Sequence, residues 1–321
     1  ILKDSKGYMW FGTKDGLNKY NGYDFVIYQH NPFDSTTLSA NYISCLYEDK
    51  RGLLWVGTYD GGLNVYIRET GTFHRIDLTE DDVLLPNVFG IKAIAEDMDG
   101  NIWVATSGNG IFKLKVNVNK GNLSFTTKRF VNEPGNPNSI SSNVVFVVYI
   151  DRRGTLWLGS SNGLDKLDVE TEAITHFLIN TKNPEAPDIF NSESIYAIHE
   201  SKDGTFWVGS LGGLVKFDRS DGTYRYFPHK YDIFNYGWGN ISSMVEDGNG
   251  DLWLATSAEL MKFDVKKETY TSFTHDPFNS KTISFNSISS VYVDNTNILW
   301  VGTTGMGIDY YDPKANRFNV F

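Results

Sequence analysis

One short phrase recurs along the whole chain and limits its possible folds more than any other feature. The consensus is Asp-x-x-Gly-x-apolar-Trp-apolar-small-hydroxyl, in seven copies whose tryptophans lie 45 to 54 residues apart. Six copies have an Asp six residues before the Trp, and Ser201 takes that place in the fifth copy. Seven of the eight tryptophans stand in the phrase: Trp10, Trp55, Trp103, Trp157, Trp207, Trp253 and Trp300. A period of this length indicates an array of repeated structural units.

The phrase predicts a tight turn followed by a buried strand. In Asp-x-x-Gly the carboxylate can accept hydrogen bonds within the turn, and Gly supplies a positive φ. The apolar residues around the Trp are typical of a buried strand. Six inner strands precede the Asp, and the fourth residue of each is Cys, Ala, Val or Ser. Such small residues are expected where strands from several units converge on one axis.

Each unit is predicted to have four strands: the inner strand, the Trp strand, a third strand such as 17–20, and an outer strand such as 25–28. Seven such units predict an all-β fold, a seven-bladed β-propeller of four-stranded antiparallel blades. An open solenoid is the competing architecture, but it does not require seven units. We expect one propeller over residues 1–321, with blades at roughly 1–30, 38–78, 87–131, 140–179, 191–228, 239–275 and 284–321.

The first blade has only the end of its inner strand, because three residues, Ile1-Leu2-Lys3, precede the first Asp. A closed ring is not expected to begin in mid-strand. We therefore expect this chain to be part of a larger multidomain protein. The alternative is a blade with three strands.

Composition excludes some classes of function. The chain has 29 Lys and Arg against 39 Asp and Glu, a formal charge of −10, which opposes a nucleic-acid partner. Cys45 is the single cysteine, so an internal disulfide cannot form. No run approaches the roughly 18 apolar residues that a membrane-spanning helix needs, so we expect no direct membrane insertion by this chain.

The extended phrase Asp-x-x-Gly-x-Leu-Trp-Val-Gly-Thr-x-x-Gly-Leu-x-x-Tyr resembles the two-component-regulator propeller repeat over all seven copies. The resemblance implies the periplasmic part of an inner-membrane sensor, in a hybrid two-component system of the Bacteroides type. Such receptors usually have two propellers, a β-sandwich domain, one membrane helix and a cytoplasmic histidine kinase. Their usual task is to detect oligosaccharides from polysaccharide breakdown and to regulate the genes that use them. Asn297, in place of the turn Gly of the last copy, departs from the family pattern.

The resemblance implies that this is the first, membrane-distal propeller. Its expected partners are an oligosaccharide, the second propeller and the β-sandwich domain of the same polypeptide, and a homodimer formed through the parent receptor is an option. Histidine kinase activity would lie outside this chain. Two alternatives stay open: the propeller is a protein-interaction or dimerisation module of the same receptor, or it is a propeller polysaccharide lyase.

Residues that occupy the same position in every copy are predicted to build the blades. We therefore expect the seven tryptophans to pack neighbouring blades together and not to stack on sugars. The Asp247 turn has the first spacings of a calcium loop, but Leu252 stands where Gly is required and Ala258 where the bidentate Glu should be. The six histidines fall at several blade positions, and the repeated Ser and Thr lack a paired base. We predict no catalytic residue, no metal and no cofactor.

Residues that differ from blade to blade are the better candidates for ligand binding, because loops on a rigid scaffold carry recognition. The loops that enter the inner strands and those that follow the Trp strands are expected to share one face. Aromatic rings beside amides and carboxylates suit a sugar, whose apolar face covers a ring while its hydroxyls meet the polar groups. The candidates are Tyr42, Tyr59, Asp60, Lys92, Asn109, Phe146, Asn162, Tyr196, Trp238, Asn240 and Glu259.

Overall fold

A computed structural model describes residues 1–80, 83–84, 90–119, 122–179, 193–229 and 239–321. The described residues form seven four-stranded sheets, and in each sheet the strands are antiparallel and follow chain order. They contain no helix, and a further two-stranded sheet pairs β9 (Thr79–Glu80) with β10 (Val83–Leu84). The predicted fold class, all-β with seven blades of four antiparallel strands, is confirmed.

The chain divides into two compact units, and the first, Leu2–Phe177, holds four blades. Blade 1 consists of β1 (Leu2–Lys3), β2 (Met9–Thr13), β3 (Gly16–Tyr20) and β4 (Phe25–Tyr28). Blade 2 consists of β5 (Ile43–Glu48), β6 (Leu54–Thr58), β7 (Leu63–Ile67) and β8 (Thr72–Ile76). Blade 3 consists of β11 (Ile91–Glu96), β12 (Ile102–Thr106), β13 (Ile111–Asn119) and β14 (Asn122–Phe130). Blade 4 consists of β15 (Val145–Ile150), β16 (Leu156–Ser160), β17 (Gly163–Leu167) and β18 (Ile174–Phe177).

The second unit, Leu178–Phe321 with Ile1, holds three blades. Blade 5 consists of β19 (Ile195–Glu200), β20 (Phe206–Ser210), β21 (Gly213–Phe217) and β22 (Tyr224–Pro228). Blade 6 consists of β23 (Ile241–Glu246), β24 (Leu252–Thr256), β25 (Leu260–Asp264) and β26 (Thr269–Phe273). Blade 7 consists of β27 (Ile288–Val293), β28 (Leu299–Thr303), β29 (Ile308–Asp312) and β30 (Arg317–Val320).

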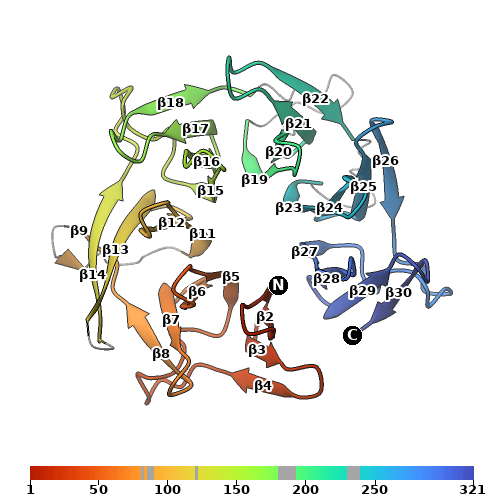
Figure 1. The fold of residues 1–321 in the computed structure, drawn as a ribbon, viewed down its shortest axis with the longest axis horizontal. Coiled ribbons are helices and arrows are strands. Elements are labelled where there is room, and N and C mark those ends of the chain that lie inside the picture. The colour runs from red at the N-terminus through yellow and green to blue at the C-terminus, as the bar shows by residue number, and fades with distance from the viewer. Residues whose placement is uncertain (81–82, 85–89, 120–121, 180–192, 230–238) are drawn as a thin grey trace. The chain divides into compact units, whose positions relative to one another are not determined.

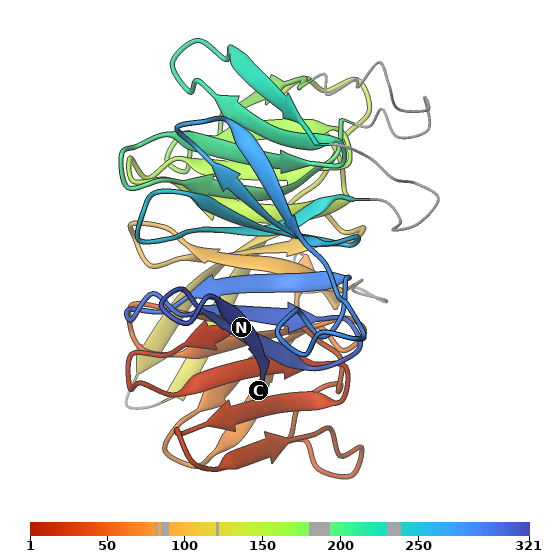
Figure 2. The ribbon, with the colours of Figure 1, turned by 90° about the vertical axis from the view of Figure 1, so that its right-hand side faces the viewer.

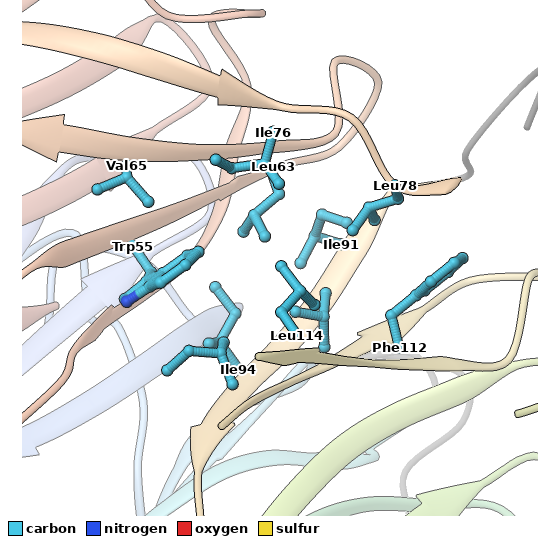
Figure 3. Close-up of a cluster of buried hydrophobic side chains, with 11 residues drawn as sticks. Trp55, Leu63, Val65, Ile76, Leu78, Ile91, Ile94, Phe112 and Leu114 are labelled. Carbon is cyan, nitrogen blue, oxygen red and sulfur yellow. The ribbon is translucent and has the colours of Figure 1, made fainter. Parts of the chain in front are cut away.

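Neighbouring blades of a unit pack face to face through apolar side chains. In the first unit the inner strands β5, β11 and β15 follow one another (Figure 1), and the strands of blade 1 lie side by side with turns at both ends (Figure 2). Between blades 2 and 3, Trp55 and Leu63 contact a cluster that contains Ile94 and Leu114 (Figure 3). In the second unit the rings of Trp207 and Phe263 meet edge to face at 5.8 Å. These contacts confirm that the repeated tryptophans pack blade against blade.

The repeated Asp joins each turn to its Trp strand. In blade 1 the Asp4 carboxylate accepts the backbone N–H groups of Lys6 and Tyr8, at 3.0 and 2.9 Å, and the indole Nε1–H of Trp10 at 2.8 Å. The same indole bond occurs in four further blades, from Trp55, Trp103, Trp157 and Trp300, at 2.9 to 3.1 Å. The prediction that these Asp residues build turns is therefore confirmed.

The hydrogen bonds also affect the pKa of the Asp4 carboxyl group. Burial acts to raise the pKa of Asp4, but hydrogen bonds from Trp10 and Arg68 outweigh it and leave the pKa below its usual value. Since the pKa is lower in the folded chain, ionised Asp4 stabilises the fold above the unfolded pKa of about 3.9. This contribution is lost as the pH falls through the lowered native pKa.

Two blades show a contact that the repeat does not require. Glu172 and Glu268 adopt a positive φ, 60° and 58°, in the turn before the outer strand. Each pairs with a basic residue of the preceding blade's outer strand, Glu172 with Lys128 and Glu268 with Arg225. Positive φ costs about 1 kcal/mol for a residue other than Gly, and the ion pair between blades offsets part of that cost.

The fifth copy provides a natural test of the Asp–Trp bond, because Ser201 is too short to reach the indole. Trp207 Nε1 is buried without a hydrogen-bond partner among the described residues. Asp97→Ala removes an acceptor of the Asn101 and Trp103 N–H groups, and we expect it to lower the free energy of unfolding by about 2–4 kcal/mol. Ser201→Ala, the matched control, should cost less than about 1 kcal/mol. Urea unfolding measures both, and equal losses would contradict the structural role of the bond.

Candidate functional site

Each complete inner strand carries a β-bulge at one repeated position. The register shifts between the first and third residues of β5, β11, β15, β19, β23 and β27, so the second residue of each lies outside the ladder. A bulge re-aims its side chain and is common beside functional sites. The bulged residues are Ser44, Lys92, Phe146, Tyr196, Ser242 and Ser289.

The bulged position is constant in geometry but variable in residue type. The residue before it is always Ile or Val and pairs with the Thr or Ser that ends the Trp strand, as Ile91 does with Thr106. Three of the predicted candidates, Lys92, Phe146 and Tyr196, stand at this position. Ser44, Ser242 and Ser289 were not predicted, although aligning the copies on the Asp places all six in one column. The bulge itself has no signature in the sequence.

Two predicted candidates of blade 2 come together as a stacked pair. Tyr42 precedes β5 and Tyr59 follows β6, and the Tyr59 N–H donates to the Tyr42 carbonyl oxygen at 2.8 Å. Their ring centroids lie 4.9 Å apart with an interplanar angle of 18°. The two residues are 38% and 51% exposed, so much of the pair faces solvent. Gly90 is required beside them, because a Cβ there would lie 2.3 Å from the Tyr59 carbonyl oxygen.

Two lysines from neighbouring blades reach this tyrosine pair. Lys92 Nζ, from the bulge of β11, lies 5.2 Å from the Tyr59 ring centroid, and Lys14 Nζ, from the turn between β2 and β3, lies 5.9 Å from that of Tyr42. Both distances are within the range of a cation–π contact. Burial lowers the pKa of Lys92 below its usual value. We call Lys14, Tyr42, Tyr59 and Lys92 the tyrosine–lysine cluster.

Lys14 was not predicted, although it follows Thr13 as Tyr59 follows Thr58, so the two residues occupy the same place in the repeat. That equivalence is the signal that could have identified it. The cluster therefore combines two positions that follow a Trp strand with one bulged position and one residue that enters an inner strand. All four residues lie in the first unit.

Cys45 lies one residue beyond the bulge of β5. A Cβ added at Gly57 would lie 2.5 Å from the Cys45 Sγ, so the thiol lies against the backbone of the Trp strand. Burial raises the pKa of Cys45 to about 12. The thiol is therefore neutral at physiological pH, and a neutral thiol is a poor nucleophile.

Of the other candidates of the first unit, Asn109 and Asn162 lie in separate turns. The Asn109 N–H donates to Thr106 Oγ1 and its carbonyl oxygen accepts from Arg129 Nε, both at 2.9 Å. The Asn162 Nδ2 donates to the Ser141 carbonyl oxygen at 3.0 Å. Asp60 is exposed next to Tyr59, and Phe146 is partly buried at its bulge. The predicted ligand contacts of these residues stay predictions, and Asn109 and Asn162 also hold their own turns.

In the second unit Tyr196 is partly buried at the bulge of β19, and Asn240 immediately precedes β23. Glu259 lies in the turn before β25, where its N–H donates to Thr256 Oγ1 at 2.9 Å, and burial raises the pKa of Glu259. Trp238 lies outside the described residues. The role of these four residues in ligand binding stays a prediction.

Two histidines of the described residues bond backbone within their own linkers. His30 and His275, from the two similar linkers, contact carbonyl oxygens through Nδ1: Leu38 at 2.7 Å and Ile283 at 2.8 Å. The two similar linkers therefore use the same contact between a histidine and a backbone carbonyl. Within the described ranges no three His, Cys, Asp or Glu side chains are grouped so that they could hold a metal ion. No helix in this part of the chain is long and apolar enough to cross a membrane.

The repeats match a known family. The model of the two component regulator propeller family matches residues 37–60, 84–108, 139–162, 189–212, 235–258 and 282–305. The chain belongs to the two-component regulator propeller family. The first copy of the phrase, around Trp10, lies before these matched stretches, so the resemblance over it depends on its residues alone.

The regulator propeller is similar to parts of larger solved and curated proteins. The extracellular domain of BT3049 from B. thetaiotaomicron, described as a hybrid two-component system, is 23% identical with a TM-score of 0.76, over 97% of this chain and 39% of that one. That of BT4673 is 20% identical with a TM-score of 0.73, over 97% and 37%. Histidine kinase P4 of Formosa agariphila is 27% identical, over 36% of this chain and 15% of the kinase. The propeller thus spans less than half the length of each relative.

The environment of Cys45 makes a prediction that spectroscopy can check. Because the thiol is partly buried and its pKa is raised to about 12, we expect the native protein at pH 8 to react with a thiol reagent at least about 100-fold more slowly than the urea-unfolded chain. The released chromophore is followed by absorbance. Equal rates in the two states would show that the β5–β6 pairing beneath the tyrosine pair is open.

Proposed function

We propose that this chain is the ligand-recognition propeller of a periplasmic sensor in a hybrid two-component system, and that it detects oligosaccharides from polysaccharide breakdown without catalysing a reaction. Two observations support the proposal. The chain consists of two-component regulator repeats, and its structural relatives include extracellular domains of such systems. In addition, the variable positions of blades 1 to 3 form an exposed cluster of a kind that suits a sugar.

The tyrosine pair is the observation that carries the proposal. Stacked Tyr42 and Tyr59 present aromatic surface at two exposed positions on a rigid hairpin. An aromatic side chain offers a large apolar face with a polar hydroxyl at its end, which fits the two-sided chemistry of a sugar ring. Because the pair is held by a backbone hydrogen bond and by packing on Gly90, little side-chain entropy is lost when a ligand binds.

The cluster is built from residues of three blades of the first unit, so a ligand bound to it would contact all three blades. Lys14 belongs to blade 1, the tyrosines to blade 2 and Lys92 to blade 3. Blades 2 and 3 are also joined nearby, where Ser44 Oγ donates to the Ile91 carbonyl oxygen at 2.6 Å. A ligand on the cluster would stabilise one arrangement of these blades. In the parent receptor such a shift in population would be passed to the neighbouring domains.

A second candidate function, a protein-interaction module of the same receptor, is favoured by the outer strand of blade 1. Phe25, Val26 and Ile27 of β4 are 48%, 50% and 61% exposed, and Tyr23 before them is 91% exposed. Successive exposed apolar residues on an edge strand can pair with another chain. Sedimentation of the wild type against Val26→Lys tests this: a dimer that dissociates in the variant would support the interaction module.

Calorimetric titration of defined oligosaccharides against this chain and the complete ectodomain tests the sensor proposal. We expect at least one oligosaccharide to bind, and we expect Tyr59→Ala to weaken it by about 1–2 kcal/mol through loss of stacking surface. Tyr23→Ala, which removes an exposed tyrosine of blade 1, is the control and should leave the affinity unchanged. If no oligosaccharide binds either protein, the recognition role is wrong.

A further inference from the structure

We propose that the tyrosine–lysine cluster selects a sugar with a negatively charged substituent, a carboxylate or a sulfate ester, over a neutral sugar. This inference rests on the proposed function, since it specifies the oligosaccharide that the same cluster would bind. The two substituents share the chemistry that matters here, which is a compact anion with several hydrogen-bond acceptors on a sugar ring.

No carboxylate of the described residues pairs with the two ammonium groups of the cluster. Among the described residues no carboxylate oxygen lies within 4.0 Å of Lys14 Nζ or Lys92 Nζ, and neither nitrogen donates a hydrogen bond. Their recorded partners are the faces of the two tyrosine rings. The chain carries a formal charge of −10, so acidic groups are abundant elsewhere. The cluster therefore places two cations without carboxylate partners beside one exposed aromatic pair.

Lys92 is the more informative of the two because it is partly buried and held by the fold. It stands at the bulge of β11, between Ile91, which pairs with Thr106, and Ala93, which pairs with Ala105. A partly buried ammonium that keeps only a ring contact has given up some of its hydration. A carboxylate or sulfate would accept hydrogen bonds from its three donors and supply the opposite charge.

The tyrosine pair indicates that the anion is attached to a sugar ring. An inorganic anion could pair with Lys14 or with Lys92 but would make no use of the exposed aromatic surface of the tyrosines. A sugar ring that bears an anionic substituent uses both features: its apolar face covers Tyr42 or Tyr59 while the substituent reaches a lysine. Acidic oligosaccharides fit this description, either those built from uronic acids or those esterified with sulfate.

Other lysines of the first unit gather around a polar cavity of about 480 Å³ beside the long hairpin β13–β14. Lys113, Lys115 and Lys128 line this cavity together with the carboxylates of Asp99 and Glu172, and Lys128 pairs with Glu172. Its positive charge is thus largely offset by acidic groups on the same wall, and no exposed aromatic pair accompanies it. Lys115 of this cavity therefore serves as the control for the lysines of the cluster.

The test compares acidic oligosaccharides with neutral forms of the same linkage. The probes are a uronate tetrasaccharide and its carboxyl-reduced form, and a sulfated tetrasaccharide and its desulfated form, each titrated against the complete ectodomain by calorimetry. We expect one acidic probe to bind at least about ten-fold more tightly than its neutral counterpart, in keeping with a charge-assisted hydrogen bond. Lys92→Met should remove most of that difference while leaving the neutral form's affinity within about two-fold, and Lys115→Met should change neither.

The outcomes test sugar binding and the preference for an anionic sugar separately. If neutral and acidic forms bind equally and Tyr59→Ala weakens both, the cluster binds sugars but does not select anions, and the inference is wrong. If the preference for the acidic form survives in Lys92→Met and in Lys14→Met, the selecting charge lies elsewhere. If no probe binds the wild type, the proposed function fails and the inference fails with it. Circular dichroism of each variant confirms that the blades are intact.

Discussion

The hydrogen bond between the repeated Asp and the indole six residues later recurs in five blades and is the side-chain interaction on which most of the structure depends. It closes the turn between the inner strand and the Trp strand and fixes the direction in which the indole points. Trp10, Trp55 and Trp103 can then be fully buried against other apolar side chains without leaving a polar N–H unpaired. One side-chain bond thus links the hairpin to the packing between blades, which explains why the same two residues recur.

Because the repeated Asp and Trp residues build the blades, a small number of other positions are free to vary. The bulge of each inner strand, the residue before that strand and the residue after the Trp strand are held in place by constant neighbours but need no particular side chain. In blades 1 to 3 these positions are filled by Lys14, Tyr42, Tyr59 and Lys92, which contact one another. The proposed recognition of a sugar therefore depends on a framework to which these residues contribute little stability.

The sequence predicted the seven blades, the strand order and the packing role of the tryptophans because periodicity determines those features directly. It also indicated Tyr42, Tyr59 and Lys92, since residues that break a repeat can be read from an alignment of its copies. It did not predict Lys14, because a lone lysine in a turn has no chemical signal until its distance from Tyr42 is known. The bulges and the positive φ of Glu172 and Glu268 were equally unpredictable, because they depend on strand register and on contacts with another blade.

The exchange of the indole Nε1 hydrogens with deuterium, followed by NMR, tests most directly whether the Asp–Trp bond holds the blades together. We predict that the Nε1–H groups of Trp10, Trp55, Trp103 and Trp157 exchange only when the protein unfolds globally, with opening free energies equal to that of urea unfolding. Exchange of these four hydrogens at the rate of a free indole, in a protein that is otherwise folded, would contradict the account.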